Sequence, residues 1–101
     1  MSTSNSVRLR EHNVLPPLTE ELVSGHPHRY YALGEYVVVQ PGVCGGRPTI
    51  KHTRIDARWL VGLWAGGLEP HEIARGYGIA PEAVQEAIAL REQYDYEQSY
   101  A

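Results

Sequence analysis

The chain is poor in the residues that build disulfides, metal clusters and membrane spans. Its 101 residues include a single cysteine, Cys44, which excludes an intrachain disulfide framework and a zinc site made of cysteines alone. No apolar run approaches the roughly 18 residues that a membrane-spanning helix needs. The segment from Met1 to Ser6 is polar and lacks the apolar core of a secretory signal. These absences favour a soluble, cytoplasmic protein without membrane contact.

An excess of positive charge is also missing. The net charge is −3 and the isoelectric point is about 5.9, which argues against a simple basic coat for nucleic acid. The charge is unevenly distributed, because residues 1–55 sum to +2 and residues 56–101 sum to −5. Any binding of an anionic partner is therefore expected in the first of these halves or at its border.

The first half of the chain is predicted to be an arm followed by short strands. Residues 1–28 are assigned to an N-terminal arm, with a short helix from Thr19 through Val23. Tyrosine- and valine-rich runs over 29–33 and 36–40 flank Gly34 and Glu35, a pattern that predicts a β-hairpin. Strands are expected between residues 29 and 51.

Helical signals dominate the second half. Asp56 is a good N-cap for a helix whose apolar residues recur at three- and four-residue spacing. Pro70 and Pro81 stand at the first position of two further helices, where a missing N–H costs nothing. Short connections join the three helices in a helix-turn-helix pattern over 56–93. Residues 29–93 are thus expected to form a single domain, followed by a flexible tail over 94–101.

The segment from Gly45 to Ile55, GGRPTIKHTRI, resembles the signature of the domain of unknown function 433 family. In that family a Gly-Lys/Arg-Pro segment leads through isoleucine and a basic residue into Gly-Thr-Arg-Ile/Val. The helical segments 67–73 and 79–84 are similar to the family as well, and the likeness covers roughly residues 41–93. His52 stands where the family has glycine. Histidine tolerates a left-handed backbone at this position but adopts it less freely than glycine does.

The resemblance implies a mainly α fold: a three-helix, homeodomain-like helix-turn-helix preceded by a short β-hairpin, often as a dimer. It also implies a non-catalytic, antitoxin-like protein of the VapB type that binds a PIN-like ribonuclease toxin, with autoregulation of its operon through DNA as a possible further role. In the family pattern the Thr53 hydroxyl bonds the backbone and Arg54 reaches across the turn. The alternatives are a stand-alone helix-turn-helix regulator that binds DNA and a dimeric interaction module that does not.

A cluster of cations is the best candidate for binding a phosphate backbone or an acidic partner surface. The third helix is a weaker candidate, because Glu82 and Glu86 would repel phosphates, although Gln85 suits an adenine. A solvated face, with Arg54 tied to a local carboxylate or carbonyl, is the competing interpretation. The candidate nucleic-acid or partner-binding residues are Arg47, Lys51, Arg54, Arg58 and Gln85.

Self-association is expected because a small domain covers large apolar side chains poorly. A two-stranded hairpin is marginal by itself, and a second chain would cover its edge and face. We therefore predict a homodimer in which the strands take part. The candidate interface residues are Tyr36, Val37, Val38, Val39, Trp59 and Trp64.

No catalytic or metal-binding constellation is evident. Cys44 and His52 lack a third group that would orient a nucleophile and its base. His26 and His28 have no carboxylate or cysteine at ligand spacing, so a surface turn is the preferred interpretation. We expect no enzyme activity, no metal and no cofactor.

Overall fold

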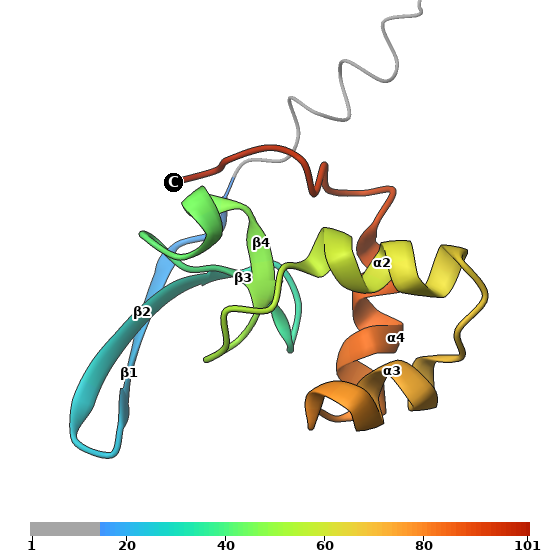
Figure 1. Ribbon diagram of the computed structural model, residues 1–101. Coiled ribbons are helices and arrows are strands. Elements are labelled where there is room, and N and C mark those ends of the chain that lie inside the picture. The colour runs from blue at the N-terminus through green and yellow to red at the C-terminus, as the bar shows by residue number, and fades with distance from the viewer. Residues whose placement is uncertain (1–14) are drawn as a thin grey trace, which may run out of the picture.

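The structure is a computed structural model that describes residues 15–101 (Figure 1). A sheet lies on one side of the molecule, and helices gather on the other. The strands are β1 (Leu18–Val23), β2 (His26–Ala32), β3 (Val37–Val39) and β4 (Pro48–Ile50); a 3-10 turn, η1 (Cys44–Gly46), precedes β4; the helices are α2 (Ala57–Ala65), α3 (Pro70–Tyr77) and α4 (Pro81–Leu90).

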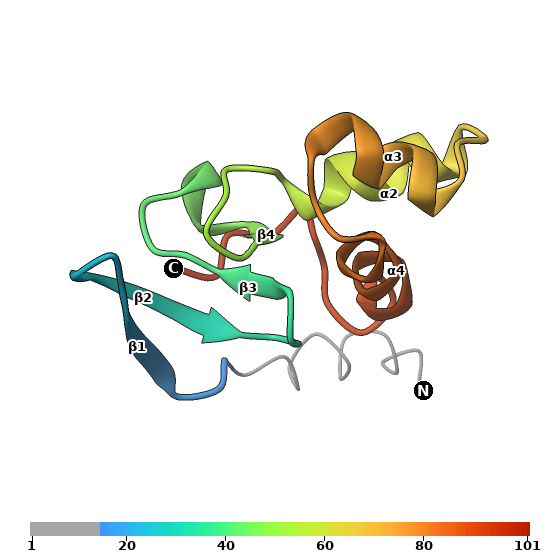
Figure 2. The ribbon, with the colours of Figure 1, turned by 90° about the horizontal axis from the view of Figure 1, so that it is seen from below.

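The four strands form one antiparallel sheet in the order β1-β2-β3-β4, each strand pairing with the next along the chain. Ser24 and Gly25 make the two-residue turn between β1 and β2, and their φ angles of 52° and 81° are both positive. Positive φ at both central residues is what a type I′ turn requires, and this turn matches the twist of a hairpin. Figure 2 shows β1 on the outside of the sheet, away from the helices.

The prediction of a mainly α, homeodomain-like three-helix fold is wrong. The sheet is prominent rather than a short hairpin, and it precedes the helices in the chain. The run Val37–Val39 explains the difference, since all three valines are fully buried in a strand that pairs on both sides. A strand covered on both faces carries no alternation of polar and apolar residues, and three residues give little local signal.

The helix predicted from Thr19 through Val23 is also wrong, because these residues form β1. Their side chains alternate between exposed and half-buried, the period of a strand with one covered face. Pairing with β2, from Leu18 opposite Tyr31 to Val23 opposite His26, outweighs the local cap and staple pattern.

The helix starts are confirmed. The Asp56 side chain accepts from the Arg58 N–H at 3.3 Å, and Pro70 and Pro81 stand at the starts of α3 and α4. The helix α2 packs against β4 and α4 packs against β3, whereas α3 packs on α2 and α4. The shared core contains Val37, Ile50, Ala57, Leu60, Ile73, Ala74, Ala83, Val84, Ala87, Tyr94 and Tyr96.

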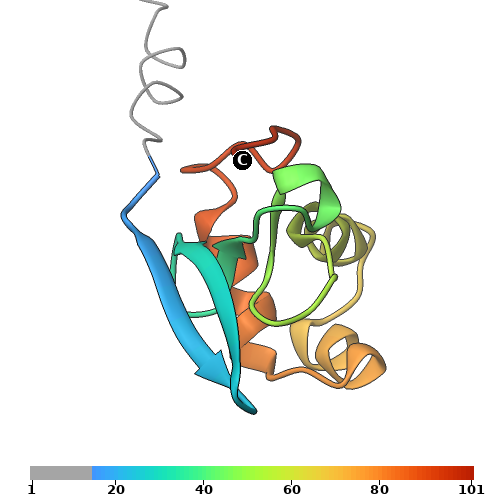
Figure 3. The ribbon, with the colours of Figure 1, turned by 90° about the vertical axis from the view of Figure 1, so that its left-hand side faces the viewer.

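The segment 94–101, expected to be a flexible tail, packs against the rest of the chain. Tyr94 and Tyr96 are buried, and the Tyr96 hydroxyl donates to the Ala87 carbonyl at 2.7 Å. The Tyr100 N–H then donates to the Gly46 carbonyl at 2.8 Å, which lays the end of the chain beside η1 (Figure 3). Both tyrosine rings are part of the core that the short helices form, and their burial orders the segment. Within residues 15–101 no helix is long and apolar enough to cross a membrane.

Candidate partner-binding site

The predicted basic segment folds around one carboxylate. Arg47 Nε lies 3.1 Å from Asp56 Oδ2, and Arg58 Nε lies 3.3 Å from the same oxygen. Asp56 is mostly buried while it also caps α2, so its charge is used within the fold. Arg47 is consequently a structural residue, which fastens β4 to the start of α2.

Arg58 and Lys51 also have partners inside the chain. Arg58 Nη1 lies 2.6 Å from Glu97 Oε1, and this hydrogen bond, with the charge of Asp56, raises the pKa of the Arg58 guanidinium. The Lys51 ammonium lies 5.4 Å from the centroid of the Tyr30 ring, a cation–π distance. Two of the predicted binding cations are therefore partly neutralised or screened by neighbours.

A tight turn presents Arg54. The Thr53 hydroxyl donates to the Ile50 carbonyl at 2.7 Å and accepts from the Ile55 N–H at 3.0 Å, as the resemblance implied. His52 has a left-handed backbone with φ of 63°. Two hydrogen bonds from the buried Gln40 amide hold this turn in place. The amide donates to the Thr53 carbonyl at 2.9 Å and accepts from the His52 N–H at 3.2 Å.

Arg54 itself does not reach across this turn to a carboxylate. Its side chain is exposed, and among residues 15–101 its guanidinium has no ion-pair partner. The Arg54 guanidinium is permanently charged and its turn is already ordered, so binding of an anion there carries no entropic cost of ordering the loop. Arg54 is thus the member of the predicted cluster that is best placed for a partner.

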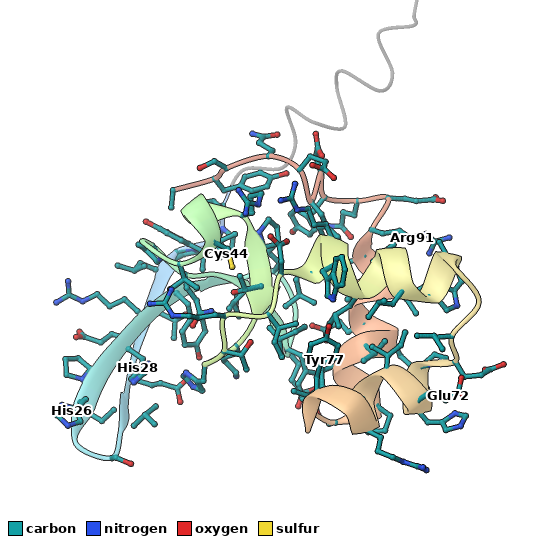
Figure 4. The ribbon with its side chains drawn as sticks, in the orientation of Figure 1. His26, His28, Cys44, Glu72, Tyr77 and Arg91 are labelled. Carbon is teal, nitrogen blue, oxygen red and sulfur yellow. The ribbon has the colours of Figure 1, made fainter. Side chains whose placement is uncertain are left out.

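Arg54 opens onto a cleft between the start of α2 and the end of α3. Trp59 and Tyr77 stand at its centre, and the Trp59 indole N–H donates to the Tyr77 hydroxyl. Their exposed fractions are 55% and 41%, large for two aromatic side chains. Tyr77 comes from the last turn of α3 and is labelled in Figure 4. The Trp59–Tyr77 cleft has a volume of about 390 Å³ and is lined by Arg54, Ile55, Asp56, Arg58, Trp59 and Tyr77.

The predicted dimer residues do not form one surface. Val37, Val38 and Val39 have no exposed surface, so the chain itself supplies the cover that motivated their assignment to an interface. Trp64 is half-buried, with the Arg91 guanidinium 4.8 Å from its ring centroid. Tyr36 is half-buried beside these valines, and Trp59 belongs to the cleft just described.

On α4, Gln85 is exposed, whereas Glu86 has a structural role that sequence reasoning missed. The Glu86 carboxylate accepts the backbone N–H groups of Glu35, Tyr36 and Val37 at 3.0, 2.7 and 2.8 Å. Gly34 allows this approach, since a Cβ there would collide with the carboxylate. The signal available in the sequence was the Gly34-Glu35 turn, which leaves successive N–H groups in need of acceptors.

The histidines and the cysteine form no reactive arrangement in the described part of the chain. His52 Nε2 lies 3.4 Å from Glu21 Oε1, and the ring centroids of His28 and His52 are 5.0 Å apart. Cys44 donates through sulfur to the Arg54 carbonyl at 3.2 Å. No group of three metal-ligating side chains is found within residues 15–101.

Comparison with known proteins adds one finding. The family described as "Protein of unknown function (DUF433)" matches residues 37–90. No curated protein and no solved structure matches the chain. The matched range runs from the start of β3 to the end of α4, so it includes the Trp59–Tyr77 cleft and the Glu86 contact but not β1 and β2.

Proposed function

The chain belongs to the DUF433 family, and we propose that it acts as a cytoplasmic, non-catalytic, antitoxin-like protein that holds a PIN-like ribonuclease toxin through the Trp59–Tyr77 cleft. The observation that carries the proposal is the pair of exposed aromatic rings beside Arg54, which has no ion-pair partner within residues 15–101. Tryptophan, tyrosine and arginine dominate the energetic hot spots of protein interfaces. The class of partner comes from the family resemblance and not from the cleft.

The chemistry of the cleft favours an acidic segment of a protein partner. A carboxylate of the partner makes charge-assisted, bidentate hydrogen bonds with Arg54, and these are stronger than neutral ones. An apolar side chain next to that carboxylate covers the rings of Trp59 and Tyr77. Arg58 adds less, because Asp56 and Glu97 already engage it.

DNA binding is the second role that the resemblance implies, and the described surface supports it less well. The exposed Gln85 on α4 shares that helix with the exposed Glu82, whose charge repels phosphates. We therefore place an operator contact at Arg54 and Lys51 rather than on α4. We further propose that the protein acts as a homodimer, which presents two clefts.

The test uses the full chain and a small PIN-like ribonuclease, sought first among the products of the genes that neighbour its own. We expect the two to co-purify, and Arg54→Ala and Trp59→Ala each to weaken the affinity by roughly 30-fold or more in calorimetry, as hot-spot losses do. Arg75→Ala is the matched control, because Arg75 is an exposed arginine on α3 that does not line the cleft. The control should stay within about threefold of the parent.

Two results would overturn the proposal. The first is an absence of binding to the ribonuclease, and the second is unaltered affinity in both cleft variants. A promoter fragment in a gel-shift experiment at low salt gives the rival outcome. If the chain binds the promoter fragment and does not bind the ribonuclease, it is a DNA-binding regulator and not an antitoxin.

A further inference from the structure

The two edges of the sheet differ in how the chain covers them. At the β4 edge, Thr49 forms a bridge with Asp56, and the Ile50 N–H donates to the Ile55 carbonyl at 3.0 Å. At the other end of the sheet, β1 pairs with β2 alone among residues 15–101. An uncovered strand edge is a row of unpaired backbone groups, which proteins normally shield or pair.

The register tells which backbone groups of β1 point outward. A two-residue turn makes its flanking pair, Val23 and His26, a hydrogen-bonded pair, and such pairs alternate along an antiparallel ladder. Pro27 supports this assignment, since it lies opposite Leu22 at a non-bonded position where no N–H is needed. The N–H and C=O groups of Leu18, Glu20 and Leu22 therefore face the open edge.

The same three residues share one face of the sheet, and both leucines on that face are exposed. Leu22 is 72% exposed and Leu18 is 47% exposed, among the largest values for leucine in the described chain. Beside them lies a hollow of about 430 Å³ whose lining includes Leu18, Pro27 and Tyr31. Among residues 15–101, an uncovered edge and two exposed leucines thus coincide on β1, the combination that a neighbouring strand covers best.

We propose that β1 pairs antiparallel with β1 of a second copy across a two-fold axis at Glu20. In this register Leu18 faces Leu22 of the second copy, and all outward N–H and C=O groups of the three residues are paired. A shift by two residues would keep the leucines on the same face but place Leu22 opposite Glu20 of the second copy, so mutual burial of the leucines selects the register. The inference rests on the proposed pairing of two copies and replaces the interface predicted from Val37 to Val39.

Charge also suits a second copy in this register. The two Glu20 carboxylates would face each other, which is unfavourable for an isolated pair. Arg29 Nε lies 3.4 Å from Glu20 Oε2 on the neighbouring strand, so each carboxylate brings its own cation. A row of four charges then crosses the axis, Arg29–Glu20 followed by Glu20–Arg29 of the second copy, with a cation at each end. The leucines on both sides of this row bury one another.

The first experiment measures the mass of the full chain by light scattering at micromolar concentration. We expect a dimer, and we expect Glu20→Pro to be a monomer, because proline removes an outward N–H without breaking a bond to β2. Leu22→Lys should also give a monomer. Leu68→Lys is the matched control, since Leu68 is 43% exposed and lies outside the sheet, and its mass should equal that of the parent.

The second experiment tests the register by oxidative crosslinking in a Cys44→Ser background. Glu20→Cys should crosslink to itself, because opposed Cα atoms of a hydrogen-bonded pair are about 5.5 Å apart, within disulfide range. Leu18→Cys and Leu22→Cys should each remain uncrosslinked, because each lies about 13 Å from its own counterpart, at ~3.3 Å per residue. A mixture of the two should crosslink.

The outcomes separate this interface from the function proposed above. A dimeric parent in which Glu20→Cys stays uncrosslinked would overturn the β1 interface and leave the pairing of copies standing. A monomeric parent would overturn both the pairing and the interface. Binding of the ribonuclease at the Trp59–Tyr77 cleft is measured separately, and neither result decides it.

Discussion

The β1–β2 hairpin and the rest of the molecule are held together in different ways. From β3 onward, Leu60, Val84 and the three valines of β3 have no exposed surface, and strands and helices share one core. Along the hairpin, Tyr30 is the single residue that is buried, with 6% of its surface exposed. One part of the chain thus covers its own apolar side chains, whereas the other leaves Leu18 and Leu22 exposed.

The hairpin is attached to the core through the pairing of β2 with β3, and His52 and Lys51 contact its side chains from the turn after β4. The Tyr30 hydroxyl donates to Glu21 Oε1 at 2.5 Å, and His52 lies against the same carboxylate. The hydrogen bond from Tyr30, with the nearby charges of His52 and Lys51, lowers the pKa of Glu21. The contact between His52 and Glu21 is partly exposed, and such a contact contributes little to stability.

The largest effect is expected in the centre of the core. Leu60→Ala removes a fully buried side chain, and the lost transfer energy together with the cavity should reduce the free energy of unfolding by about 2–5 kcal/mol. Urea denaturation measures the change. A loss below about 1 kcal/mol would contradict the view that this part of the chain is tightly packed.

The next effect concerns the contact that joins the helices to the sheet. Glu86→Ala leaves the N–H groups of Glu35, Tyr36 and Val37 without their acceptor, so we expect a loss of about 2–4 kcal/mol in the same assay. Glu82→Ala, at an exposed position of α4, is the control and should cost less than about 1 kcal/mol. Equal losses in both variants would mean that the contact does not join the two layers.

A smaller effect, with a pH signature, is expected where the tail joins the core. Tyr96→Phe removes a hydroxyl that donates to the Ala87 carbonyl, which should cost about 1 kcal/mol at neutral pH. Burial raises the pKa of Tyr96 in the folded chain, so the unfolded chain loses this proton first. The contribution is present below the unfolded pKa of about 10 and falls as the pH rises further.

Denaturation series from pH 8 to 11 measure this difference. The parent should lose stability above about pH 10 more steeply than the phenylalanine variant does. Parallel curves would show that Tyr96 leaves the core before it ionises, and that residues 94–101 belong with the loosely attached part of the molecule.

The smallest effect is expected in the hairpin. In a Glu20→Pro background, which we expect to be monomeric, Leu22→Ala should change the free energy of unfolding by less than about 0.5 kcal/mol, because Leu22 is 72% exposed. Without Glu20→Pro, the same change should cost more, since the second copy covers the leucine. If Leu22→Ala in the monomeric background destabilised the chain nearly as much as Leu60→Ala does, the hairpin and the core would not differ in packing.

Local signals predicted the helices and part of the turn geometry. Asp56, Pro70 and Pro81 start helices where expected, because a cap or a first-turn proline acts within one turn of the chain. The Thr53 hydroxyl forms the bonds that its position in the family pattern implied.

Features that depend on contacts between distant parts of the sequence could not be predicted from these local signals. Residues 19–23 carry helix-start residues, and only pairing with β2 makes them a strand. Among the four cations, Arg54 was the one expected to be tied to a local carboxylate or carbonyl, whereas in the fold Asp56 engages Arg47 and Arg58 and Arg54 is exposed. These outcomes depend on partners brought close by the rest of the chain, which no window of sequence contains.

The contact of Glu86 with the turn before β3 also sets an order of events during folding. The hairpin closes over a two-residue turn and pairs residues that are close in sequence, so its contacts are local and can form quickly. The turn at residues 35–37 waits for a carboxylate that lies 49 to 51 residues later in the chain. In folding, the contacts between β1 and β2 are therefore available earlier than the contact that joins the sheet to α4, which closes a much longer loop.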